Sequence, residues 1–120
     1  MRGAYNMIYV FPAVFEYNEN DEAFEVDFPD IEGCFTCGYT LKEAVAMAED
    51  VLNLVLWDKE YNGEDIPIPS DIKDLRKPIH EKGFLSYILA DTEAYSAVMV
   101  RENPQMHFDL SRIKKESKAV

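Results

Sequence analysis

The segment FEVDFPDIEGCFTCGYTLKEAVAMAEDVLNLVL, residues 24–56, decides the fold, because it places a strand, a turn, a second strand and a capped helix in immediate succession. Apolar and acidic residues alternate in its first part, which is typical of a strand with one buried face and one face in solvent. A turn over residues 29–33 then leads into a short strand over residues 34–37. The apolar face of the first of these strands contains Phe24, Val26 and Phe28, and the solvent face contains Glu25 and Asp27.

A helix of roughly 20 residues, about 30 Å long, is predicted to follow. Thr40 is placed to cap its first free amides, and Glu43, three residues later, is placed to reach back and complete a capping box. Apolar residues then recur at helical spacing up to about Lys59, so one side of the helix is expected to pack on the sheet. Asn62 and Gly63 are expected to end the helix. They are Leu41, Ala44, Val45, Ala48, Val51, Leu52 and Val55.

Another strand is predicted before this segment, over residues 5–17, which are rich in aromatic and β-branched side chains. Only a short polar turn separates it from the strand that starts at Phe24, so the two are expected to form a hairpin. Both faces of the first strand are apolar, which predicts burial on two sides. Pro12 cannot donate to a ladder of hydrogen bonds and therefore predicts an edge or a bulge.

The second half of the chain adds a connection, a strand and a helix. Residues 66–70 contain two prolines and must run extended. Residues 84–90 predict a fourth strand, and Asp91 is placed to cap a helix over residues 92–100. The sequence therefore predicts an α+β fold of order β-β-β-α-β-α, with three antiparallel strands, a fourth strand and one long helix packed on them.

A chain of 120 residues fits one domain, which we expect over residues 1–100, followed by a tail over residues 101–120. The net charge of −11 repels the nucleic-acid backbone and favours a basic partner, although acidity that only keeps the protein soluble explains the charge equally well. The sequence shows no apolar signal core and no segment long enough to span a bilayer. We therefore expect a cytoplasmic protein that does not enter a membrane and whose two cysteines form no disulfide.

Every charged residue between Glu16 and Glu32 is acidic, and this run has three interpretations. It can be a solvated face, a surface that binds a partner, or the metal site of a nuclease. A two-metal site needs several carboxylates that converge in a cleft, whereas the strand periodicity sends the acids of the second strand to solvent. The partner surface is therefore preferred to the metal site. The acids assigned to it are Glu16, Glu25, Asp27 and Asp30.

Cys34 and Cys37 have the spacing of a metal or redox motif, but the chain has no second cysteine pair, and His80 and His107 stand far apart. Residues three apart on a strand face opposite sides, and a redox cysteine is favoured at a helix N-terminus, where this chain has Thr40. We expect Cys34 to be a small buried apolar side chain, and we expect no metal and no cofactor. Without a glycine-rich phosphate loop or a nucleophile elbow, the sequence does not indicate an enzyme.

Residues 9–16 and 24–36 resemble the N-terminal domain of HicB antitoxins, and the order of turn, strand, capped helix, proline stretch and last strand does so as well. The resemblance covers about residues 5–95. It implies a partial RNase H-like fold that lacks the acids of the nuclease. The positions that carry the family motif or a structural role are Pro29, Gly33, Cys34, Thr36, Gly38, Thr40, Glu43 and Ala44.

The resemblance also implies a function. Members of this family are antitoxins of type II toxin–antitoxin systems, which cover the active surface of HicA, a small basic toxin that cleaves mRNA with a histidine. The acids assigned to the partner surface would then contact the toxin, and the chain would form a homodimer or a homotetramer. The alternative is a stand-alone HicB-like binding or regulatory module without a cognate toxin.

HicB proteins commonly end in a DNA-binding domain that represses their own operon. The residues after Tyr95 do not show the strand and two helices that a ribbon-helix-helix needs, so operator binding by this chain is not expected. The basic residues near the end of the tail can be a remnant of such a domain or can hold an oligomer together. They are Arg112, Lys114, Lys115 and Lys118.

Overall fold

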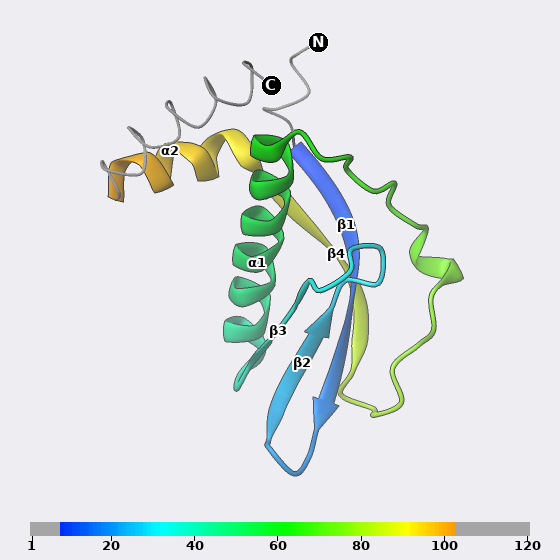
Figure 1. The fold of residues 1–120 in the computed structure, drawn as a ribbon. Coiled ribbons are helices and arrows are strands. Elements are labelled where there is room, and N and C mark those ends of the chain that lie inside the picture. The colour runs from blue at the N-terminus through cyan, green and yellow to red at the C-terminus, as the bar shows by residue number, and fades with distance from the viewer. Residues whose placement is uncertain (1–7, 103–120) are drawn as a thin grey trace.

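The computed structural model describes residues 8–102, which form a four-stranded antiparallel sheet, two α-helices and one short 3-10 helix (Figure 1). The strand order is β3-β2-β1-β4, and each neighbouring pair is antiparallel. The α+β class and the element order predicted from the sequence are confirmed. The elements are β1 (Ile8–Asn18), β2 (Ala23–Asp27), β3 (Phe35–Gly38), α1 (Leu41–Asn62), η2 (Ile72–Asp74), β4 (Phe84–Asp91) and α2 (Thr92–Glu102).

Helix α1 begins at the predicted cap. The Thr40 hydroxyl accepts a hydrogen bond from the amide of Glu43 at 3.0 Å, and the Glu43 carboxylate accepts one at 2.6 Å from the amide of Tyr39, one residue before the cap. Gly63, with φ 71°, ends the helix after Asn62, which confirms the predicted end. The predicted cap of α2 is also present, since the Asp91 side chain accepts from the amide of Ala94 at 3.1 Å.

The hydrophobic core lies between α1 and one face of the sheet. Phe11 and Phe15 point from β1 into this layer, and the rings of Phe15 and Phe84 stack with centroids 4.4 Å apart. Figure 1 shows α1 lying along this face, while residues 63–83, called the connector below, run along the opposite side of the sheet. Other buried members of the core are Ala13, Val26, Phe28, Ile31, Cys34, Ala44, Ala48, Leu52, Leu56, Ile88 and Ala90.

The prediction that the first strand is buried on both faces is wrong for the N-terminal end of β1. Ile8 is 60% exposed and Val10 is 42% exposed, because the connector covers only the later part of that face, where Pro12 is buried and Val14 is half-buried. Pro12 was expected at an edge or a bulge, and the structure confirms an edge at this position, although β1 as a whole is a central strand. Only Val14–Asn18 pair with β2, so at Pro12 the sheet has a neighbour on one side only. Residues 5–7, the predicted start of this strand, lie outside the described residues.

Gly38, at the end of β3, allows the sheet to approach the first turn of α1. A Cβ atom at this position would lie 2.5 Å from the backbone nitrogen of Ala44 and 2.7 Å from its Cα. Both residues are buried, and the atoms that would clash belong to the backbone of a capped helix, which cannot move aside easily. The glycine and the alanine of the motif are therefore explained by close packing between strand and helix.

We expect Gly38→Ala to lower the free energy of unfolding by about 1–3 kcal/mol, the usual cost of forcing extra volume into a packed contact. Urea denaturation of the variant and the wild type measures this difference. Cys37→Ala changes the exposed neighbour on the same strand and should alter stability by less than about 0.5 kcal/mol. Equal stability of Gly38→Ala and wild type would show that β3 and α1 are not in tight contact.

A buried carboxylate joins β1, α1 and α2. Glu60 is only 7% exposed and accepts hydrogen bonds from the Tyr9 hydroxyl at 2.7 Å and from the Thr92 hydroxyl at 2.9 Å. Burial raises the pKa of Glu60 above the ordinary value of a glutamate, while the two hydrogen bonds act in the opposite direction. Burial and the neighbouring carboxylate also raise the pKa of Tyr9. No local pattern in the sequence indicates this contact, because Tyr9 and Glu60 are 51 residues apart.

The raised pKa of Glu60 means that the folded state holds its proton to a higher pH than the unfolded chain does. The contribution of Glu60 to the free energy of unfolding should therefore fall as the pH rises from about 4.5 toward neutrality. We expect Glu60→Gln to reduce this fall, as measured by urea denaturation at several pH values. Glu49→Gln, which changes an exposed residue on the same helix, should keep the wild-type slope. Parallel curves for Glu60→Gln and wild type would contradict the assignment.

Candidate partner-binding surface

The face of the sheet opposite α1, called the open face below, carries the acidic side chains of β1 and β2. Glu16 of β1 lies directly opposite Glu25 of β2, and Asp27 lies opposite Val14 on one side and Phe35 on the other. Glu25 and Asp27 are exposed, which confirms the solvent-facing periodicity predicted for this strand. Like charges directly opposite on neighbouring strands repel each other, so the sheet needs hydrogen-bond donors here.

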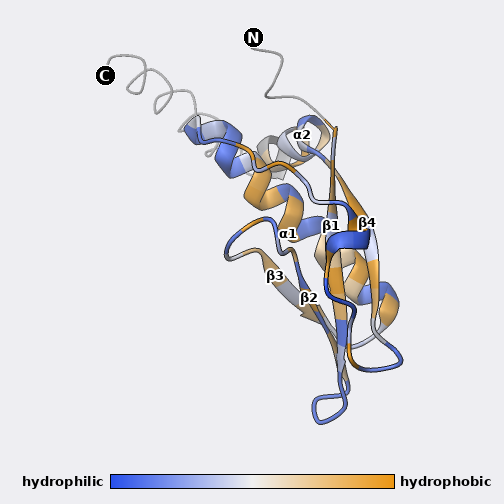
Figure 2. Cartoon of the chain, turned by 90° about the vertical axis from the view of Figure 1, so that its right-hand side faces the viewer, coloured by the Kyte–Doolittle hydropathy of each residue, from blue (hydrophilic) through white to orange (hydrophobic). Residues whose placement is uncertain are grey.

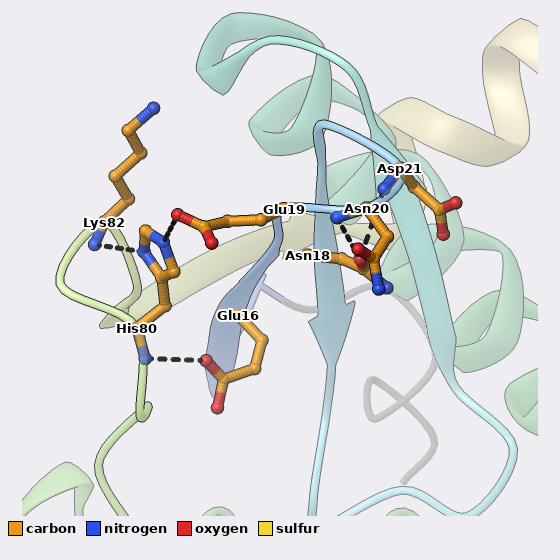
Figure 3. Close-up of polar contacts among 7 residues, drawn as sticks. All are labelled: Glu16, Asn18, Glu19, Asn20, Asp21, His80 and Lys82. Atoms are coloured by element: carbon orange, nitrogen blue, oxygen red, sulfur yellow. Dashed lines mark hydrogen bonds and ion pairs between the residues drawn. The ribbon is translucent and has the colours of Figure 1, made fainter.

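The connector supplies donors to Glu16. The Glu16 carboxylate accepts from the amide of Ile79 at 3.1 and 3.2 Å and from the amide of His80 at 3.4 Å. Figure 3 shows the Glu16 side chain pointing toward the backbone of His80. On the other strand, the Asn18 side chain donates to Glu25 at 3.2 Å. Each of the two opposed carboxylates thus accepts hydrogen bonds from its own donors.

His80 also binds the turn that joins β1 and β2. Its Nε2 lies 2.9 Å from the Glu19 carboxylate, and its Nδ1 accepts from the amide of Lys82 at 3.0 Å, which leaves the proton on Nε2 to face Glu19 (Figure 3). The hydrogen bond from His80 lowers the pKa of Glu19. The Lys82 ammonium lies 4.5 Å from the centre of the Tyr17 ring, a cation–π contact. A histidine and a lysine of the connector therefore sit against the acidic hairpin.

Asp30 holds the other end of the connector. Its carboxylate accepts from the Ser70 amide at 2.9 Å and from the Ser70 hydroxyl at 2.6 Å. Ser70 ends the extended proline stretch, so this contact fixes the stretch to the turn between β2 and β3. The structure thus gives Asp30 and Glu16 roles within the chain, and their contact with a partner stays a prediction.

Glu25 and Asp27 remain exposed beside β3, an edge strand of the described sheet. Phe35, the cross-strand neighbour of Asp27, is 66% exposed, and Cys37 next to Glu25 is exposed as well. Desolvation raises the pKa of Asp27. Phe35 is not among the predicted partner-binding residues, although the alternation of Cys34, Phe35 and Thr36 places its ring on the same face as the two acids.

The motif residues between β2 and β3 build a tight turn. The amide of Phe28 donates to the carbonyl of Cys34 at 3.0 Å, and the amide of Ile31 donates to the carbonyl of Phe28 at 3.0 Å. Gly33 has φ 77°, a conformation that glycine adopts without strain. The motif residue Pro29 is exposed in this turn. The turn closes with Cys34, so β3 begins one residue later than predicted.

Cys34 is fully buried, which confirms its expected role as an apolar side chain. Burial and the negative charge of Asp27 raise the pKa of the Cys34 thiol to about 11, which disfavours the reactive thiolate. Cys37 is exposed and points to the other side of the sheet, and both thiols are free. The last motif residue of the strand, Thr36, is half-buried opposite Val26.

Within residues 8–102, no three His, Cys, Asp or Glu side chains come together as metal ligands would. The nuclease interpretation required such a group, and the described acids instead spread over an open surface and two turns. His107 and the basic end of the tail lie outside the described residues. Over the same part of the chain, neither helix is long and apolar enough to cross a membrane.

The arrangement of strands and helices is that of the HicB domains of bacterial toxin–antitoxin systems. A chain of a toxin–antitoxin complex from Streptococcus pneumoniae matches with a TM-score of 0.67 and 24% identity over 94% of this chain and 98% of that chain. A chain of the HicA3 and HicB3 toxin–antitoxin complex matches with a TM-score of 0.54 and 24% identity, over 69% of this chain and 99% of that chain. The N-terminal domain of the Burkholderia pseudomallei antitoxin HicB matches with a TM-score of 0.53 and 21% identity, over 67% of this chain and 95% of that domain.

The family follows from the sequence itself. The family model described as the HicB-like antitoxin of bacterial toxin–antitoxin systems matches residues 11–116, and the chain belongs to this family. A search of curated proteins finds no match. The matched range includes most of the predicted tail, residues 101–120. The division of the chain at residue 100 stays a prediction, and so does the likeness to RNase H.

We expect Asp30→Ala to release the proline stretch, because it leaves the Ser70 amide and hydroxyl without their acceptor. Hydrogen exchange should become faster at the Ser70 amide, and the free energy of unfolding should fall by about 1–3 kcal/mol, the usual loss for hydrogen bonds to a charged group. Glu32→Ala removes an exposed acid from the same turn and should change neither. Unchanged exchange at Ser70 in Asp30→Ala would contradict the contact.

Proposed function

We propose that this chain is an antitoxin that binds a basic, HicA-like toxin and neutralises it by covering the surface with which the toxin cleaves mRNA. Membership of the HicB-like family supports an antitoxin role. Two of the similar structures are complexes of a toxin with its antitoxin, which supports a protein partner. Blockade of this kind needs a complementary surface and no chemistry, so we further propose that the chain is not an enzyme, uses no cofactor and acts in the cytoplasm.

The observation that carries the proposal is the exposed pair Glu25 and Asp27 beside the exposed ring of Phe35. Carboxylates on a protein of net charge −11 speed the approach of a basic partner and select against acidic ones. An aromatic side chain next to them can be buried by the partner, and aromatic residues often dominate binding energy. The β2–β3 part of the open face therefore combines attraction at a distance with an apolar contact.

The hydrogen bonds within the chain also limit which acids should contact the toxin directly. Glu16 and Asp30 already accept hydrogen bonds from the connector, and Glu19 already pairs with His80. A toxin would have to displace these bonds before it could use the same carboxylates. Glu25 accepts from a single donor, the Asn18 side chain at 3.2 Å, and both Glu25 and Asp27 are exposed, so a partner can reach them at much lower cost.

We expect the double variant Glu25→Lys and Asp27→Lys to slow association with the basic toxin by at least tenfold at low salt and to flatten the dependence of the rate on salt. Stopped-flow or surface plasmon resonance measurements at several ionic strengths give these rates. The matched control is Glu49→Lys with Asp50→Lys, which makes the same change in net charge at exposed positions of α1. If both variants slow association equally, the overall charge matters and the open face does not.

Co-expression with the product of an adjacent small basic reading frame tests the toxin itself. Joint purification, and loss of RNA cleavage when the chain is added, are expected. If no such product binds, the stand-alone HicB-like module becomes the better description.

A further inference from the structure

The connector holds two isoleucines, Ile68 and Ile79, almost completely in solvent. Ile79 is 89% exposed and Ile68 is 87% exposed, the highest values among the large apolar side chains that the structure describes. Figure 2 views the chain from the side of the connector, which is mostly hydrophilic, so the two side chains are exceptions on this surface. The other aliphatic side chains of the connector are half-buried, namely Ile66, Ile72 and Leu75. The connector therefore covers part of its apolar surface and leaves these two side chains in water.

Both exposed isoleucines lie on a restricted backbone. Each follows a proline, Pro67 or Pro78, whose ring fixes one of its own backbone angles. Ile68 also precedes Pro69, which restricts the backbone of Ile68 itself. A side chain that is already held in place loses less conformational freedom when a partner covers it than one on a freely moving loop does. The two isoleucines are therefore suited to an apolar contact with another molecule.

Two of the acids that were assigned to the partner surface hold the backbone at these positions. The Glu16 carboxylate accepts from the amide of Ile79 itself at 3.1 and 3.2 Å. The Asp30 carboxylate accepts from the amide of Ser70 at 2.9 Å and from its hydroxyl at 2.6 Å, two residues after Ile68. Each exposed isoleucine thus has a carboxylate bound at or near its own backbone, which fixes where its side chain lies.

The same two anchors place the isoleucines next to the exposed acids of the open face. Glu16 lies directly opposite Glu25 on the neighbouring strand, and Asp30 follows Asp27 by three residues. A second copy of this chain would bring acids against acids here, whereas a basic protein would meet the opposite charge. Apolar contacts beside attracting charges strengthen a complex mainly by slowing its dissociation. The surroundings of the two isoleucines therefore favour a basic protein as the partner.

We infer that Ile68 and Ile79 contact the basic toxin, and that Asp30 and Glu16 are positioning residues for them. This inference rests on the proposed function and deepens it, because it adds an apolar contact on the connector to the acidic surface around Phe35. It also gives Glu16 and Asp30 a part in binding for which the toxin does not have to displace their hydrogen bonds.

The test measures the complex between the full chain and the product of the adjacent small basic reading frame, by surface plasmon resonance at low and high salt. We expect Ile68→Ser and Ile79→Ser each to raise the dissociation rate by about tenfold or more, the usual effect of losing one buried aliphatic side chain. The association rate should stay within about twofold of the wild type, because the charge of the chain is unchanged. The faster dissociation should persist at high salt, which screens charges but not apolar contacts.

Leu54→Ser is the matched control. Leu54 is 42% exposed on α1, which lies on the other face of the sheet, and this variant should keep the wild-type rates. All three substitutions change exposed side chains, so the circular dichroism spectrum and the urea midpoint of each variant should match those of the wild type.

A double-mutant cycle tests the positioning role of Glu16. Glu16→Ala should raise the dissociation rate by about fivefold in the wild-type background and by less than about twofold in the Ile79→Ser background, because residues that act through one another are not additive. Glu32→Ala removes an exposed acid from the turn between β2 and β3 and should leave the dissociation rate unchanged in both backgrounds.

Four results would overturn the inference. The first is a wild-type complex whose dissociation neither isoleucine variant changes, and this result leaves the proposed function intact. The second is an equal effect of Glu16→Ala in both backgrounds, which would make Glu16 a direct contact of the toxin. The third is isoleucine variants that change the molar mass of the free chain in light scattering but not the dissociation of the toxin, which would assign the two side chains to a second copy. The fourth is a wild-type chain that binds no such basic product, and this result overturns the proposed function as well.

Discussion

The contact between Gly38 and the first turn of α1 is the constraint on which the rest of the structure depends. It fixes the start of a long helix against the end of β3 with no room for a side chain, so α1 must lie across one face of the sheet. The helix ends near the start of β1, where the Glu60 carboxylate accepts a hydrogen bond from the Tyr9 hydroxyl. Strand β4 begins at the other end of β1, opposite Phe15. The connector therefore has to span the length of β1. Because α1 covers one face of the sheet, the connector runs along the other face.

This path explains why only part of the acidic run is available to a partner. The connector brings backbone amides, one histidine and one lysine to a hairpin whose own charges are all negative. Glu16 and Glu25, which repel each other across two strands, thus have separate donors. Acids that looked alike in the sequence become two groups, one that holds the connector and one that faces solvent.

The open face is divided by the same path. Its β2–β3 part is acidic with one exposed ring, and its middle is covered by the connector. Its β1–β4 part is apolar and ends at β4, an edge strand among the described residues. A single small sheet can therefore offer two surfaces of different chemistry without competition between them.

The sequence by itself determined the elements and their order, because these depend on contacts within a few residues. The alternation in β2, the Thr40–Glu43 cap, the end of α1 at Gly63 and the Asp91 cap are all local, and each is present. The periodicity also established that Glu25 and Asp27 face solvent and that Cys34 is buried. Errors arose where a distant segment decides burial, as on β1, whose second apolar face is covered only where the connector passes.

Only the tertiary structure decided what each acid does. Glu16 meets His80 across 64 residues, Asp30 meets Ser70 across 40, and Glu60 meets Thr92 across 32. No local pattern marks such pairs, since hydrogen bonding depends on where the packed sheet places each side chain and not on its neighbours in the chain. The Phe24–Leu56 segment determined the fold and indicated the family, and the course of the connector determined which acids remain exposed for binding.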